Sequence, residues 1–172
     1  MYESCLLNRG DIMRALVVYS SQTGNTRKLA EAVFETLGGN KEMYPVQEAP
    51  DPAGYDFIAV GFWLQAGKPD PKSAEYIGKI GKKSLFLFAT HGAAAGSDHA
   101  ISAMNAATAL ASEADIIGTY SCQGEVNPKV LEKAKTKPEP PVWISDAPDA
   151  AGHPDAADIE VLKYQISELL SK

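Results

Sequence analysis

A short apolar run followed by a small polar turn constrains this chain more than any other feature. Residues 15–19, ALVVY, are almost wholly apolar and rich in β-branched side chains, which indicates a strand buried on both faces of a parallel sheet. Residues 20–26 then supply hydroxyl, amide and glycine residues. An apolar stripe at helical spacing follows, with Leu29, Val33 and Leu37 on one side. The sequence therefore predicts a strand, a tight turn and a helix in direct succession.

This turn predicts an anion site at the start of the helix. Backbone N–H groups point outward at a helix N-terminus, and the helix dipole favours negative charge there. Hydroxyl groups on Ser20, Ser21, Thr23 and Thr26 add donors for phosphate oxygens. Simple helix capping by the same residues is the alternative. The turn contains neither GxxxxGK[ST] nor GxGxxG, and its one glycine is Gly24, so we expect a compact terminal phosphate rather than a bridging pyrophosphate.

Composition and charge narrow the class of protein. The 172 residues are 45% hydrophobic and 22% charged, which is ordinary for one globular domain with a substantial core. A net charge of −6 argues against nucleic-acid binding, which would require a basic face, and favours partners with a basic surface. The ordinary mild acidity of cytoplasmic proteins is the alternative explanation. The sequence has no apolar run long enough to span a membrane.

Cysteine usage and the first residues bear on location and domain boundaries. Cys5 and Cys122 lie far apart and form no metal-ligand cluster, so we expect a reduced, cytoplasmic setting. Residues 1–12 do not resemble a secretory signal, because their apolar part is short and lacks a basic start. Met13 is a candidate initiator directly before the first strand. We treat residues 1–12 as an extension and expect a single domain over residues 13–172.

Strand and helix patterns alternate along the rest of the chain. Strands are predicted at residues 42–46, 55–62, 84–90 and 115–122, and helices at residues 71–80, 99–114, 128–137 and from about residue 155. Asp70, Asp98 and Asp155 are the expected helix caps, and Ile101 and Met104 are expected on one face of the alanine-rich helix. This alternation of strands and helices indicates right-handed βαβ units. It predicts an α/β, doubly wound, five-stranded parallel sheet in the order 2-1-3-4-5, with helices on both faces and a ligand crevice beyond strands one and three.

The polar turn resembles the FMN-phosphate loop of the flavodoxin family. Residues 21–26, SQTGNT, match the family pattern [ST]-x-T-G-x-T directly after the first strand. The resemblance covers about residues 13–170, and this loop is its most specific part. It implies a flavodoxin-like flavoprotein with FMN as its cofactor, held at this turn by Ser20, Ser21, Gln22, Thr23, Gly24, Asn25 and Thr26.

The resemblance also assigns roles to the loop after the second central strand. Trp63, which follows Gly61 and Phe62, offers an indole that can stack on the flavin and exclude water. The alternative is that Phe62 and Trp63 end a core strand, and we expect Phe62 to be core. Gly67 matches the glycine whose peptide turns over when the flavin of flavodoxins gains an electron, which requires a positive φ. An ordinary loop glycine is the alternative.

Two more loops complete the expected flavin site. In residues 90–97, THGAAAGS, small side chains would let backbone N–H groups reach the ring edge, and the expected contacts are Thr90, His91, Gly92, Ala93 and Gly96. This loop lacks the acidic residue and second aromatic residue that the family often has there. A neutral or cationic His91 beside the flavin would favour the reduced ring, and an exposed His91 is the alternative. The last strand ends at Cys122, Gln123 and Gly124, and without a CxxC motif we expect no redox-active thiol.

A proline-rich segment separates the last two predicted helices. Five prolines in residues 137–154, at positions 138, 140, 141, 148 and 154, exclude regular helix. The apolar residues Val142, Trp143 and Ile144 would be costly to leave in water, so we expect them to pack on the domain. We interpret the segment as a connector, with a partner-binding arm as the alternative.

The leading functional hypothesis is a small FMN protein that carries electrons between redox partner proteins. Such a carrier needs a tuned cofactor with an exposed edge and no general acid or nucleophile. The alternative is an FMN-dependent reductase, or a reductase subunit, acting on a quinone, azo or tetrapyrrole-type substrate. A receiver domain or a small phosphatase is disfavoured, because the sequence has Tyr19-Ser20 and Gly61-Phe62 where a receiver needs acidic residues, and no Cx₅R after the first strand.

Overall fold

One twisted sheet organises the part of the chain that the computed structural model describes, residues 13–172. The predictions on residues 1–12 lie outside this range. The strands are β1 (Arg14–Tyr19), β2 (Asn40–Pro45), β3 (Phe57–Gln65), β4 (Lys68–Pro69), β5 (Ser84–His91) and β6 (Asp115–Gln123). The order β2-β1-β3-β5-β6 is parallel throughout, and β4 pairs antiparallel with β3. This confirms the predicted strand order and α/β class.

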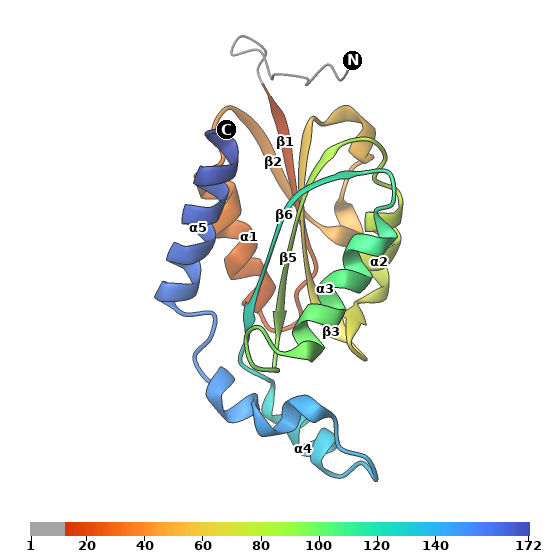
Figure 1. Cartoon of the computed structure of the whole chain (residues 1–172), viewed down its shortest axis with the longest axis vertical. Coiled ribbons are helices and arrows are strands. Elements are labelled where there is room, and N and C mark those ends of the chain that lie inside the picture. The colour runs from red at the N-terminus through yellow and green to blue at the C-terminus, as the bar shows by residue number, and fades with distance from the viewer. Residues whose placement is uncertain (1–12) are drawn as a thin grey trace.

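Helices cover both faces of the sheet (Figure 1). The α-helices are α1 (Asn25–Thr36), α2 (Pro71–Gly78), α3 (Asp98–Leu110), α4 (Pro128–Lys135) and α5 (Ala156–Leu170), and the short 3₁₀ turns are η1 (Val46–Glu48), η2 (Pro52–Gly54), η3 (Val142–Ser145) and η4 (Ala147–Ala150). Helices α1 and α5 lie on one face and α2 and α3 on the other, while α4 lies below the carboxyl ends of the strands. Over residues 13–172, every helix is too short or too polar to cross a bilayer.

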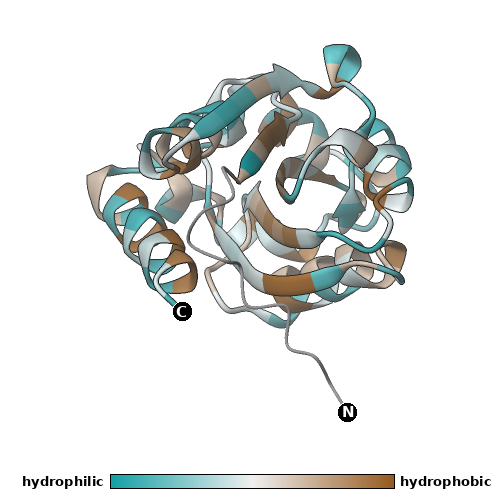
Figure 2. Cartoon of the chain, turned by 90° about the horizontal axis from the view of Figure 1, so that it is seen from above, coloured by the Kyte–Doolittle hydropathy of each residue, from teal (hydrophilic) through white to brown (hydrophobic). Residues whose placement is uncertain are grey.

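Alternating side chains of the central strands fill two hydrophobic layers. Leu16 and Val18 of β1 belong to the layer shared with α2, whereas Ala15 and Val17 belong to the layer shared with α1 and α5. All four side chains are fully buried, as expected for a strand covered on both faces. Figure 2, which looks along the strands, shows hydrophobic residues on the central strands and along the inner sides of the helices. The sheet is therefore a rigid platform for the loops at its carboxyl edge.

The segment after the second central strand differs from the prediction. Strand β3 continues to Gln65, and a tight turn at Ala66 and Gly67 reverses the chain into β4. Both turn residues have positive φ, 51° for Ala66 and 74° for Gly67, as hairpins with the favoured right-handed twist require. The expected loop is thus a short hairpin. It was missed because Ala-Gly is a weak signal for a two-residue turn compared with Asn-Gly or Asp-Gly.

The alanine-rich helix also differs in detail. Ser97, not Asp98, is the N-cap, because its Oγ accepts a hydrogen bond from the Ala100 backbone N–H. The buried face consists of Ala100, Ala103 and Ala107, whereas Ile101 is 50% exposed. Met104 is partly buried and packs against the same core, so the fully buried stripe of this helix consists of alanine side chains.

The other predicted caps and the proline-rich segment follow the expectation more closely. Asp70 caps α2, and Asp155 caps α5 in a capping box with Asp158. The proline-rich segment contains no α-helix and forms the turns η3 and η4. Its apolar residues pack only in part, since Trp143 and Ile144 are half-buried but Val142 is 72% exposed.

Gly61 in the middle of the sheet should not tolerate a side chain. A Cβ at this position would overlap the Phe88 ring, whereas a Cβ at Gly78 in α2 would meet no heavy atom within 4 Å. We expect Gly61→Ala to lower the free energy of unfolding by about 1–3 kcal/mol, the usual cost of overpacking a core. Gly78→Ala, the matched control, should be neutral or slightly stabilising. Urea unfolding of both variants tests this, and equal stabilities would contradict it.

Candidate flavin site

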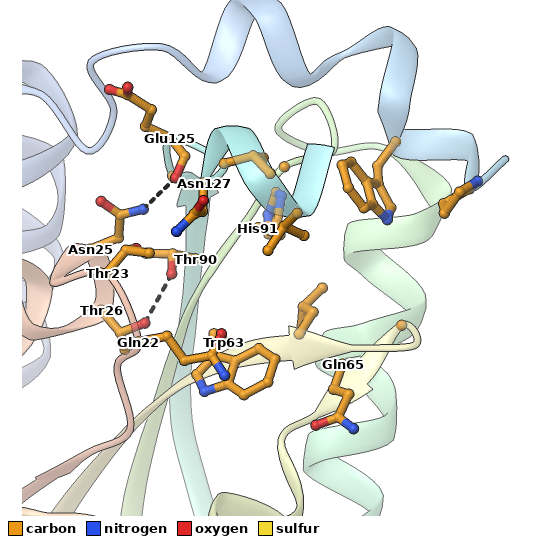
Figure 3. Close-up of a pocket in the computed structure, with 18 of the residues that line it drawn as sticks. Gln22, Thr23, Asn25, Thr26, Trp63, Gln65, Thr90, His91, Glu125 and Asn127 are labelled. Carbon is orange, nitrogen blue, oxygen red and sulfur yellow. Dashed lines mark hydrogen bonds between the residues drawn. The ribbon is translucent and has the colours of Figure 1, made fainter. Parts of the chain in front are cut away.

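A cavity in the described part of the chain lies at the carboxyl edge of the sheet, where the fold class predicts a ligand crevice. It has a volume of about 560 Å³ and is open to solvent on one side. Its walls come from the turn before α1, the β3–β4 hairpin, the end of β5 with the start of α3, and the segment from Gly124 to Trp143 (Figure 3). Loops far apart in the sequence therefore meet at one place.

The polar turn before α1 forms one end of this cavity. Gly24 is the N-cap of α1 with a φ of 92°, and its N–H donates to Ser21 Oγ at 3.1 Å. Gln22 and Thr23 are exposed and line the cavity. Because the first backbone N–H groups of a helix lack partners inside the helix, the turn combines free donors with the positive end of the α1 dipole. The arrangement can bind a compact anion.

Two hydrogen bonds connect this turn to the neighbouring loops. The hydroxyl groups of Thr26 and Thr90 lie 2.9 Å apart in a buried pair that joins α1 to the end of β5. The Asn25 side-chain amide donates to the Glu125 backbone oxygen at 2.9 Å, which joins α1 to the loop after β6 (Figure 3). Gly124 makes this second contact possible, since a Cβ there would lie 2.9 Å from Asn25 Nδ2. Three loops are thus held in fixed relation.

Trp63 forms the wall on the β3 side. Its indole N–H donates to Ser20 Oγ at 3.2 Å, and Ser20 is itself only 6% exposed. Ser20 therefore orients the indole and does not line the cavity. The indole face remains half-exposed and borders the cavity. Phe62, the preceding residue, is fully buried in the core, as expected.

His91 places an unpaired acceptor in the cavity wall. Its Nδ1 lies 2.9 Å from the Ala93 backbone oxygen, so Nδ1 carries the proton and donates this bond. The Nε2 atom is buried without a partner in residues 13–172. Burial lowers the pKa of the His91 imidazole, which favours the neutral ring. His91 is therefore buried and neutral rather than exposed or cationic, and its Nε2 is a hydrogen-bond acceptor without a partner in the described residues.

Several residues expected to contact a cofactor lie outside the cavity. Gly61 and Phe62 are buried in β3, and Ser20, Ala93 and Cys122 are also buried. The residues that do not line the cavity are Ser20, Gly24, Gly61, Phe62, Ala93, Gly96, Cys122 and Gln123. Cys122 is 3% exposed, and burial raises the pKa of its thiol to about 12, so the thiolate is disfavoured. Gln123 donates instead to the backbone oxygens of Gly92 and Asp146.

The remaining predicted residues line the cavity together with others that the sequence did not single out. Expected and found at the cavity are Ser21, Gln22, Thr23, Asn25, Thr26, Trp63, Gly67, Thr90, His91, Gly92 and Gly124. Not expected were three groups: Leu64, Gln65 and Ala66 of the hairpin; His99 of α3; and Glu125, Val126, Asn127, Val130, Lys137, Pro141, Val142 and Trp143 from the segment after β6. The signal that could have found the last group was Trp143, a large aromatic residue in a segment that leaves the carboxyl edge of the sheet.

Comparisons with known proteins agree with this fold. The family described as "Flavodoxin domain" matches residues 16–167, so the chain belongs to the flavodoxin-domain family. It is 28% identical over 159 residues to a flavodoxin-like domain-containing protein BilS of Clostridioides difficile, covering 86% of this chain and 90% of that protein.

Solved structures show the same fold at low sequence identity. Oxidised flavodoxin 1 of Bacillus cereus matches with a TM-score of 0.61 at 13% identity, covering 92% of this chain and 97% of that one. A flavoprotein of Lactobacillus acidophilus, solved in complex with FMN, matches with a TM-score of 0.53 at 17% identity, covering 63% of this chain and 93% of that one. The predicted flavodoxin-like fold is therefore confirmed.

The buried hydroxyl pair of Thr26 and Thr90 should behave as one energetic unit. Thr26→Val or Thr90→Val alone leaves one buried hydroxyl without its partner, at a cost of about 1–3 kcal/mol in unfolding free energy. The double variant, with two apolar side chains of similar shape, should cost clearly less than the sum of the single variants. A double-mutant cycle by urea unfolding measures this coupling. Strictly additive effects would show that the two hydroxyl groups do not depend on each other.

Proposed function

We propose that this chain binds FMN and carries electrons between redox proteins. The observation that carries the proposal is the hydroxyl-lined turn at the N-terminus of α1, which opens on the same cavity as Trp63 and His91. One end of the cavity suits a phosphate, one wall suits a flat ring, and a third element offers a hydrogen-bond acceptor. FMN has a group for each of these features.

The residues present fit this cofactor. Ser21, Gln22 and Thr23, together with the first backbone N–H groups of α1, would hold the phosphate. Trp63 would cover one ring face, and His91 Nε2 would gain the partner that it lacks. The family and the FMN complex of the Lactobacillus acidophilus protein support this assignment. When bound, FMN supplies reversible electron-transfer chemistry.

The role of Gly67 stays a prediction that its geometry supports. It has a φ of 74° and lies at the cavity in the hairpin turn. A Cβ there would lie 3.2 Å from His99 Cε1, so a larger residue would be both strained and crowded. Glycine adopts either peptide orientation at such a turn with the least strain, which supports the predicted role.

A carrier rather than an enzyme is supported by the titratable groups at the cavity. These are His91, His99, Glu125 and Lys137 among the lining residues. His91 is held neutral by burial, and its Nδ1–H is already donated to Ala93. This side chain is placed to accept a hydrogen bond rather than to deliver a proton. The cavity is thus equipped to bind and orient a cofactor, and a carrier needs no more.

One observation favours the alternative, an FMN-dependent reductase or reductase subunit. The outer rim of the cavity is apolar, with Val130, Pro141, Val142 and Trp143 in its lining. Such a rim could hold a flat apolar substrate beside the cofactor. The quinone, azo and tetrapyrrole-type classes remain candidates for this alternative.

The partner proposal rests on charge. A net charge of −6 supports redox partners with a basic docking face. Helix α4 and the turn after it carry lysines at positions 129, 133, 135 and 137, of which Lys137 lines the cavity, so we expect such a partner to dock away from α4. A cytoplasmic location is proposed with it, because the buried Cys122 is a free thiol and reduced thiols persist in that compartment.

Loss of the Thr23 hydroxyl should weaken the binding of FMN but not of riboflavin, which lacks the phosphate. A hydroxyl bonded to a charged phosphate contributes about 1.5–3 kcal/mol, so Thr23→Ala should weaken FMN binding by roughly 10-fold or more. Thr119→Ala, at an exposed position on β6 outside the cavity, is the control and should change neither affinity. Flavin fluorescence titration measures both ligands. A wild-type protein that binds neither ligand would overturn the proposed function.

The carrier and reductase proposals differ in what the FMN-loaded protein does alone. A carrier should exchange electrons quickly with a basic haem protein, at a rate that falls as salt screens the charges, and should oxidise NAD(P)H only slowly without a separate reductase. Stopped-flow absorbance at several ionic strengths tests this. Rapid NAD(P)H oxidation with reduction of a quinone or azo dye would favour the enzyme instead.

A further inference from the structure

The proline-rich segment after α4 contributes an indole to the cavity. Trp143 lies in η3 and, with Trp63, is one of two indoles among the lining residues. The two come from separate walls, since Trp63 belongs to β3 and bonds to Ser20, whereas Trp143 packs on the loop after β5. A cavity with an indole on two different walls is suited to a flat aromatic ligand.

The contact between Trp143 and the loop after β5 depends on Gly92. A Cβ at Gly92 would lie 3.2 Å from Cε3 of the Trp143 ring and 2.8 Å from the Val126 side chain. The indole therefore rests directly on the Gly92 backbone. No residue of the loop from Gly92 to Ser97 is aromatic, so Trp143 supplies the large apolar surface that this wall would otherwise lack.

Asp146 holds the segment in this position. Its carboxylate accepts a hydrogen bond from the Ala94 backbone N–H at 2.9 Å, and its backbone oxygen accepts one from the Gln123 side chain at 3.4 Å. Its own N–H donates to the Trp143 backbone oxygen at 3.1 Å. One residue thus connects the η3 turn to the loop after β5 and to the end of β6.

We propose that Trp143 is a flavin-contacting residue and that the proline-rich segment is a wall of the binding site rather than a connector. Asp146 is its positioning residue. This inference rests on the proposed function, because it assigns Trp143 to the ring of the same FMN. The half-buried state of Trp143 fits this role, since an indole beside an open cavity has apolar surface left to cover.

Flavin emission tests the contact. An indole quenches an excited flavin by electron transfer, which requires contact, and this chain has two tryptophans. In the Trp63→Phe variant the remaining indole is Trp143, so the fluorescence of bound FMN should remain quenched. In the variant with both Trp63→Phe and Trp143→Phe, the fluorescence of bound FMN should increase. Equal brightness in these two variants would overturn the proposal.

Affinity provides a second measurement that does not depend on the first. Trp143→Ala should weaken FMN binding by about 10-fold, because an aromatic contact and its buried area are lost. Ile144→Ala is the matched control, since Ile144 lies in the same turn but does not line the cavity, and it should have little effect. Equal losses in both variants would assign the effect to packing of the segment and overturn the proposal. Failure of the wild-type protein to bind FMN would overturn the proposed function as well.

The role of Asp146 can be measured without any flavin. In the Trp63→Phe background, Asp146→Ala should make the emission of Trp143 more sensitive to acrylamide, because the segment is released from Ala94. Asp146→Asn keeps a side-chain oxygen for the Ala94 N–H and should preserve the protection. Unchanged sensitivity in the Asp146→Ala variant would remove Asp146 from the proposal.

Discussion

The buried hydrogen bond between the Thr26 and Thr90 hydroxyl groups is the interaction on which the site depends. It joins the first turn of α1 to the last residues of β5, and the bond from Asn25 to the Glu125 backbone adds the loop after β6. These residues belong to segments that only the sheet order β2-β1-β3-β5-β6 brings together. Because the strands beneath are buried on both faces, the loops meet over a platform that cannot shift without breaking core packing. The polar turn before α1, Trp63 and His91 are thereby kept at one cavity.

Two glycines, which have no side chain, also shape the site. Gly92 and Gly124 each occupy a place where a Cβ would press against a neighbouring loop. At Gly92 the neighbours are Trp143 and Val126, and at Gly124 they are Asn25 and Thr90. The absence of side chains at these positions lets the segments after β5 and β6 close around the cavity. The proline-rich segment is then more than a connector, because Asp146 ties it to the same loops.

Much of the fold was predictable because it follows from local patterns. The apolar run before Ser20, the caps at Asp70 and Asp155 and the alternation of strands and helices all depend on neighbours in the sequence, and the structure agrees with them. The prediction was wrong where a local signal was weak or ambiguous. Ala66 and Gly67 form a hairpin turn without the usual Asn-Gly or Asp-Gly pair, and Ser97 rather than Asp98 caps α3. In the first case the turn residues give only a weak signal, and in the second Ser97 and Asp98 are adjacent candidates for the same cap.

The sequence by itself determined the α/β architecture and the polar turn, since periodicity and a contiguous motif encode these features, and the family resemblance implied Trp63 as a candidate wall. The tertiary structure decided which expected residues reach the cavity. Gly61, Phe62 and Cys122 lie in the sheet behind it, whereas Trp143 enters from a segment about eighty residues after Trp63. It also decided that His91 is buried and neutral, with Nε2 unpaired. The physical reason is that burial and long-range contact depend on how distant segments pack, and no local pattern of residues records that packing.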